Sequence, residues 1–164
     1  MTMFSSQWFA SSGAVAAAIF VSQTDDLVNA TNFTFTNHAI GAANATRKVV
    51  VMVMSGGGST GTISGVTLAG NSMTEIVGGT LWVENDVGMY QYDLSSGTTA
   101  TIVVSHSGGK GYCSVGVWAV NGAEDSAHDT LSVTGDTTPN GTIDIPANGV
   151  LLCGCSASAG SNPT

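Results

Sequence analysis

The feature that most constrains this chain is a succession of short runs rich in Val, Ile, Thr and Tyr, separated by Gly, Asn, Asp and Ser. Such runs are typical of β-strands bounded by turns. Ten strands are predicted, at residues 32–36, 48–54, 63–69, 72–77, 87–94, 100–105, 112–120, 130–133, 142–145 and 150–155. A parallel α/β fold would need crossover helices, which this pattern does not contain. We therefore expect an all-β fold, an antiparallel β-sandwich of jelly-roll or Ig-like type.

Two of these runs predict how their strands are covered. The run at residues 48–54, KVVVMVM, is apolar at successive positions. Because side chains alternate between the faces of a strand, this strand should be central and covered on both sides. The run at residues 142–145, TIDI, alternates and should have one face in water.

The first 30 residues differ from the rest of the chain. Phe4, Trp8 and Phe9 stand among Ser, Gln and Gly, with no obvious strand partner. We predict two parts, an extended N-terminal arm over residues 1–30 and a β-sandwich domain over residues 31–164. Large apolar side chains on such an arm are costly in water, so the three aromatic residues are candidate anchors for a partner protein. The competing interpretation is that they fold back onto the domain.

The charge balance excludes several classes of partner. The chain of 164 residues has only 9% charged residues, three of them basic, and its net charge is −8. Three cations cannot form the basic footprint that nucleic acid or an anionic membrane requires. Residues 14–21 are apolar but too few to span a bilayer, and the N-terminus has no basic region typical of a secretory signal. A surface so poor in charge favours association with other proteins, including copies of itself.

No constellation of residues predicts an enzyme. His38, His106 and His128 lie near Ser, Thr or Asp only as any Ser/Thr-rich sequence would place them, which does not predict a catalytic triad. The acids Glu84 and Asp86 are expected to be solvated turn residues. The same is expected of Glu124 and Asp125.

Metal and cofactor sites are not expected either. Residues 124–129, EDSAHD, lack a calcium-loop spacing, and residues 55–59, SGGGS, lack the Lys of a phosphate loop, so both are expected to be loops. Cys113, Cys153 and Cys155 are expected to be small core residues in a chain that folds in a reducing compartment.

Two sets of aromatic residues remain. Trp118 lies in the run GVWAV and is expected in the core. Trp82, Tyr90 and Tyr92 are candidate contacts for a glycan or a partner, with core packing as the alternative for Trp82.

Four segments resemble a β-sandwich module of tailed-phage virion structural proteins. They are residues 47–51 (RKVVV), 66–74 (VTLAGNSMT), 97–104 (GTTATIVV) and 116–122 (GVWAVNG). The resemblance as a whole extends over roughly residues 30–155. The resemblance implies a structural protein of a tail fibre, a baseplate appendage or a capsid decoration.

We therefore expect a non-enzymatic virion protein, of tail-fibre or baseplate-attached type, assembled in the cytoplasm of a bacterial host. It would contact other virion proteins through its arm and its own copies through the sandwich, with a trimer as one form. A capsid decoration (head) protein is the nearest alternative, and a carbohydrate-binding module is the alternative from another class.

Overall fold

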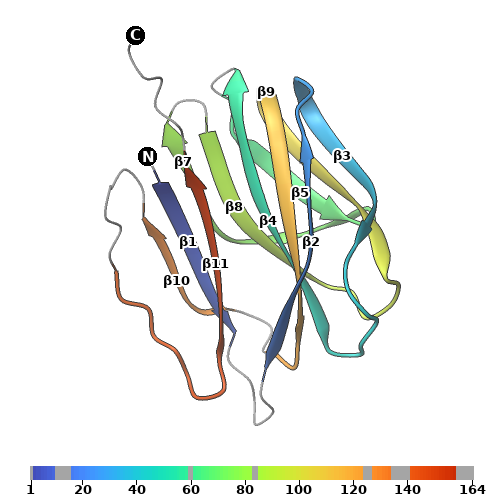
Figure 1. The fold of residues 1–164 in the computed structure, drawn as a ribbon, viewed down its shortest axis with the longest axis vertical. Coiled ribbons are helices and arrows are strands. Elements are labelled where there is room, and N and C mark those ends of the chain that lie inside the picture. The colour runs from blue at the N-terminus through green and yellow to red at the C-terminus, as the bar shows by residue number, and fades with distance from the viewer. Residues whose placement is uncertain are drawn as a thin grey trace.

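The computed structural model describes residues 2–9, 16–58, 61–82, 85–123, 127–133 and 141–157. Every regular element in these ranges is a β-strand, and all strand pairs are antiparallel (Figure 1). The strands are β1 (Thr2–Phe9), β2 (Ala17–Asp26), β3 (Ala30–Ala39), β4 (Arg47–Gly58), β5 (Ile63–Leu68), β6 (Asn71–Ser72), β7 (Thr74–Trp82), β8 (Asn85–Asp93), β9 (Thr99–Asn121), β10 (Ala127–Val133) and β11 (Val150–Ala157). The expected all-β class is confirmed.

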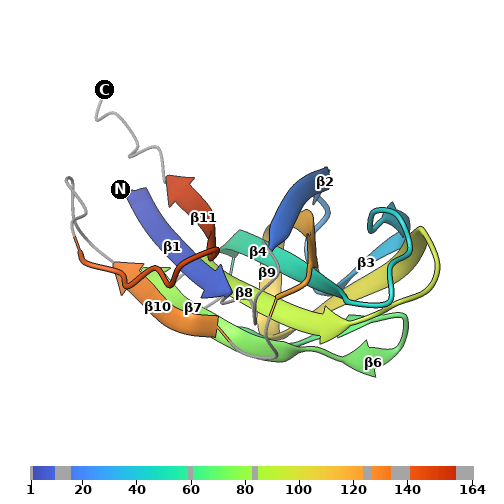
Figure 2. The same cartoon turned by 90° about the horizontal axis from the view of Figure 1, so that it is seen from below.

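The strands form two sheets. The larger has eight strands, in the order β6-β5-β9-β4-β8-β7, with β2 and β3 both paired to β9. It curls until it nearly closes into a barrel (Figure 2). The smaller sheet has the order β10-β1-β11, and its strands β10 and β1 contact β7.

The curl of the larger sheet follows the long strand β9. It has 23 residues. Its first half pairs with β3 and β5, and its second half pairs with β2 and β4. The register of β3 and that of β5 both shift where they face residues 105–110 of β9. Two strands expected at residues 100–105 and 112–120 are therefore one bent strand, because glycines at positions 108, 109 and 111 let it bend without ending.

Glycine is required where the end of β4 approaches this bend. A Cβ on Gly61 would lie 2.2 Å from the backbone nitrogen of Gly108, and one on Gly111 would lie 2.9 Å from the carbonyl oxygen of Gly57. The segment expected to be a flexible loop at residues 55–59 is instead strand as far as Gly58. Its glycines permit close backbone contact, which is one of the uses of Gly in strands.

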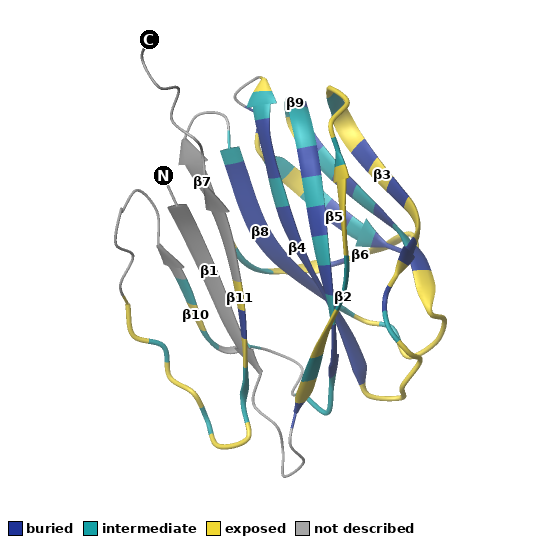
Figure 3. Cartoon of the chain, in the orientation of Figure 1, coloured by how far each residue is buried: buried dark blue, intermediate teal, exposed yellow. Residues whose placement is uncertain are grey.

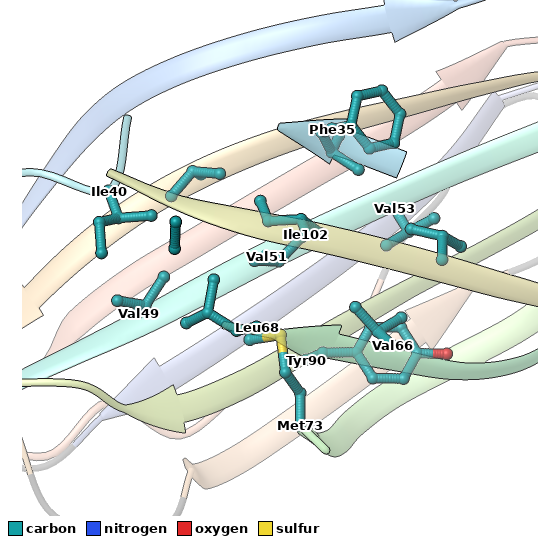
Figure 4. Packing of buried hydrophobic residues seen from close by; sticks show 14 of the residues in the cluster. Phe35, Ile40, Val49, Val51, Val53, Val66, Leu68, Met73, Tyr90 and Ile102 are labelled. Atoms are coloured by element: carbon teal, nitrogen blue, oxygen red, sulfur yellow. The ribbon is translucent and has the colours of Figure 1, made fainter. Parts of the chain in front are cut away.

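The core confirms the expectation for β4. Val49, Val51 and Val53 belong to the main core cluster, which Figure 4 shows together with side chains of β5, β8 and β9. On the opposite face of β4, Val50 packs with Leu152 of β11. Both faces are covered, and among the residues whose burial is described, β8, β4 and β9 are the most buried strands (Figure 3). Burial of each such Val stabilises the fold by about 1.5–3 kcal/mol.

The N-terminal residues have strand partners that the sequence did not reveal. β1 lies between β10 and β11, and β2 pairs with the second half of β9. Phe4, Trp8 and Phe9, for which no strand partner was expected, therefore lie in a strand that distant segments pair on both sides. The domain boundary at residue 30 and the anchoring role stay predictions.

Two other expectations are corrected. Residues 142–145 are not a strand, and Ile145 is exposed. The backbone nitrogen of Asp144 instead donates a hydrogen bond to Asp129, 2.9 Å away.

Trp118, expected in the core, is only half-buried. It lies on the outer face of β9, where its ring meets that of Phe20 edge-on at 5.2 Å between centroids.

Candidate functional site

The most concentrated polar chemistry is a buried cluster formed by Ser55, Asp86, His106 and Lys110. Ser55 lies near the end of β4, in register with Asp86 on β8, and the other two residues lie at the bend of β9. His106 Nε2 lies 2.8 Å from Ser55 Oγ, and Lys110 Nζ lies 3.0 Å from Asp86 Oδ2. All four residues are buried. The bend of β9 thus places an ion pair and a Ser–His hydrogen bond inside the molecule.

The surroundings of His106 favour its neutral form. Burial is the largest influence and lowers the pKa of His106, and the charge of Lys110 lowers it further. A backbone hydrogen bond with Thr31 and the charge of Asp86 act in the opposite direction but do not reverse the shift. His106 is therefore a neutral hydrogen-bonding partner of Ser55 at pH 7.

The cluster contains a serine, a histidine and an aspartate, but it is not arranged for nucleophilic catalysis. Asp86 forms an ion pair with Lys110, and the residue is 3% exposed. Ser55 is 2% exposed, so its hydroxyl is not presented to a substrate. A nucleophile needs both an oriented base and access to the reacting atom. The geometry fits a polar network that holds three strands together.

A groove of about 250 Å³ runs beside the cluster, lined by Asp86, Glu75, Tyr90 and Thr62 among others. The Tyr90 hydroxyl donates to Glu75 Oε2 at 3.3 Å. Burial raises the pKa of Tyr90, and the negative charge of Glu75 adds to this effect. Tyr90 therefore stays protonated and acts as a donor.

The candidate glycan contacts are not brought together as an open platform. Tyr90 is only 4% exposed and belongs to the core cluster, so its ring has no face free for stacking. Tyr92 is half-buried and packs against the same cluster. Trp82 ends β7, and its side chain lies outside the described residues.

The anchor residues are placed by their backbone alone. In β1, Phe4 pairs with Cys155 and Val133, and Trp8 pairs with Leu151. Phe9 pairs with Val150 and Ala127. The side chains of Phe4, Trp8 and Phe9 lie outside the described residues.

Arg47 is a second polar centre that the sequence did not reveal. It is 1% exposed. Its guanidinium group donates to five backbone carbonyls, those of Gly41, Ala42, Leu94, Ser96 and Gly97, at 2.6 to 3.0 Å. It thereby ties the loop before β4 to the loop between β8 and β9.

All three basic residues of the chain are buried. Lys48, 4% exposed, reaches out to Asp93, whose side chain is 67% exposed, at 2.6 Å. Arg47 and Lys110 are the other two. The sequence contains no other Lys or Arg, so the accessible surface presents neither residue type. Each of the three has a partner, as a buried cation requires.

The remaining acids and cysteines require two corrections. Asp86 was expected in a solvated turn but is buried in an ion pair, because Lys110 from the distant strand β9 lies against it. Cys113 is buried as expected, and burial raises its pKa to about 12. Cys153 is exposed rather than in the core, because its neighbour Leu152 takes the inward position on β11. The side chain of Cys155 lies outside the described residues.

Other expected loop residues fall partly outside the described ranges. Glu84, Glu124 and Asp125 lie outside them, and Ala127 begins β10. Within the described part of the chain, no group of three or more His, Cys, Asp or Glu residues could hold a metal ion. That same part contains no helix long and apolar enough to cross a membrane.

Comparison with known proteins gives no relative: no family model, no curated protein and no solved structure matches this chain.

The burial of His106 predicts how the free energy of unfolding depends on pH. Since its pKa is lower in the folded protein than in the unfolded chain, the unfolded chain binds the proton more readily below pH 6.5. The free energy of unfolding should therefore fall as the pH drops from about 7 to about 5. Thermal melts across this range check it, and His106→Gln should remove part of the slope. An unchanged slope in that variant would contradict the prediction.

Proposed function

We propose that this chain is a non-enzymatic structural protein of a tailed-phage virion, of tail-fibre or baseplate-attached type, that assembles with other virion proteins and with its own copies. The single observation that supports the proposed assembly is an apolar patch on the outer face of β9 and β4. Phe20, Met52, Met54, Trp118 and Cys153 line a groove there of about 230 Å³. Phe20 is 53% exposed, and the neighbouring Ile19 is 59% exposed. We call these five groove residues the Phe20 patch.

The charge distribution supports association through apolar contact. The accessible surface presents no Lys or Arg, so neither residue type is available for ion pairs between copies. It also presents no Lys or Arg to phosphates, which supports partners other than nucleic acid. Phe20 is exposed, and aromatic side chains are among the residue types enriched at protein interfaces.

The virion assignment rests on the sequence resemblance of the four β segments. The curled sheet with the smaller sheet against it is compatible with the sandwich that the resemblance implies. A capsid decoration protein would use the same kind of surface, and only its position in the particle distinguishes it. No observation favours carbohydrate binding at Tyr90, because its ring is buried.

The assembly is tested by the mass of the protein in solution. Light scattering during size-exclusion chromatography at about 100 µM protein should give a mass that is a multiple of the 16.4 kDa of one chain. Phe20→Ser should shift it toward the monomer, because it removes the exposed ring and its contact with Trp118. Val28→Ser is the matched control, since Val28 is 69% exposed but lies outside the Phe20 patch. A wild-type monomer at this concentration would overturn the proposed assembly.

A further inference from the structure

Both lysines of the chain form an ion pair with an aspartate, and the two pairs differ in burial. Lys48 Nζ lies 2.6 Å from Asp93 Oδ1, and the side chain of Asp93 is 67% exposed. Lys110 Nζ lies 3.0 Å from Asp86 Oδ2, and these two side chains are 0% and 4% exposed. The same functional groups are therefore in contact at two places, once beside water and once inside the protein.

The buried pair joins two strands that are not neighbours. Strand β4 lies between β9, which carries Lys110, and β8, which carries Asp86. The residue of β4 that faces Lys110 is Gly58, and Gly56 and Gly57 precede it. Because glycine has no side chain, this end of β4 leaves room for the Lys110 side chain to cross it and meet Asp86. Three strands thus hold the amine and the carboxyl group in contact.

The surroundings of this pair favour uncharged groups. Removal from water penalises the ionised forms of both an amine and a carboxyl group. Ser55 and the neutral His106, the other members of the cluster, add no charge that would offset this penalty. Transfer of one proton from Lys110 Nζ to the Asp86 carboxylate removes both charges at once. It leaves an amine, which is a nucleophile, beside a carboxylic acid.

We propose that Lys110 and Asp86 condense to form an intramolecular amide, an isopeptide bond. The electron pair of Lys110 Nζ forms a bond to Asp86 Cγ, and the hydroxyl of the carboxyl group leaves with a proton from Nζ as one molecule of water. The reaction needs no oxidant and no further reactant. The released water has a way out, because Asp86 lines the groove of about 250 Å³ described above.

Fixed contact and burial both drive this reaction. Well-oriented groups within one molecule react as if each were present at roughly 10⁵–10⁸ M. The amide is uncharged, so its formation removes the penalty for burying two ions. The pair formed by Lys48 and Asp93 has the contact without the burial, and water keeps its groups ionised. We therefore expect one bond, between β8 and β9, for which the ion pair is the starting state.

The mass of the denatured full chain tests this proposal. By mass spectrometry, the purified protein should be lighter than its sequence by one water molecule. Lys110→Arg keeps the cation but removes the amine, so this variant should have the mass of its sequence. Lys48→Arg is the matched control and should still lack one water. After chymotrypsin digestion, tandem mass spectrometry should find a branched peptide that joins Lys110 to Asp86.

Three outcomes would overturn the proposal: a mass equal to that of the sequence, a loss of water that persists in Lys110→Arg, or a loss that the digest places at other residues. If Lys110→Arg does not fold, the digest of the unmodified protein decides alone. The result is independent of the assembly proposed for the Phe20 patch, because a bond within one chain does not change the number of copies.

Discussion

Replacing Lys110 by Met should lower the free energy of unfolding by about 3–5 kcal/mol, because it leaves the carboxylate of Asp86 buried without its cation. The side chains of Lys110 and Asp86 are 0% and 4% exposed, and their charged atoms lie 3.0 Å apart. Asp86 lines a groove, but its side chain is only 4% exposed, so water solvates little of the carboxylate once the cation is gone. Urea unfolding of the purified protein measures the loss.

The same substitution at Lys48 is the matched control. Lys48 also forms an ion pair, but the side chain of its partner Asp93 is 67% exposed and can be solvated after the change. Lys48→Met should therefore cost much less, about 1 kcal/mol. The double variant Lys110→Met, Asp86→Asn should recover part of the loss, since neither buried charge remains. Equal losses for Lys110→Met and Lys48→Met would show that the buried ion pair is not the cause.

Replacing Arg47 by Met should destabilise the protein by at least about 4 kcal/mol, because each hydrogen bond to a charged donor contributes about 1.5–3 kcal/mol. Five backbone carbonyl acceptors lose their donor at once. Arg47→Lys keeps the charge but has at most three donors without the planar fork, so it should give an intermediate loss. Urea unfolding of both variants checks the order.

Amide hydrogen exchange should show which part of the backbone opens more often when Arg47 is replaced. Amides in the loop between β8 and β9 should exchange faster in Arg47→Lys, because Arg47 holds the carbonyls of Leu94, Ser96 and Gly97. An Arg47→Lys variant with wild-type stability and unchanged amide exchange in this loop would contradict the role given to the guanidinium group.

Local sequence pattern was sufficient to predict the class of fold and the burial of β4. Period-two alternation and turn residues are properties of neighbouring positions, so most strands lie near the expected ranges. The run KVVVMVM predicted two covered faces because no polar residue interrupts it, and Val50 and Val51 are both fully buried on opposite faces.

The errors arose where partners are distant in sequence. Strand β1 is completed by β11, nearly the whole chain away, and nothing near Phe4 indicates this pairing. The glycines around Lys110 read locally as a turn, yet strands on both sides continue β9 through them. Asp86 looked like a turn acid because its cation lies on another strand. Strand pairing and ion pairing over such separations are set by packing, which a local pattern does not contain.

The burial of all three basic residues also determines how readily trypsin cleaves the protein. Trypsin cleaves after Lys and Arg in extended, accessible chain, and here every such bond lies inside a strand of the large sheet, at Arg47, Lys48 and Lys110. Cleavage therefore requires β4 or β9 to leave the sheet, which amounts to opening the core. Resistance to trypsin then reports the population of the opened molecule rather than the exposure of a surface loop.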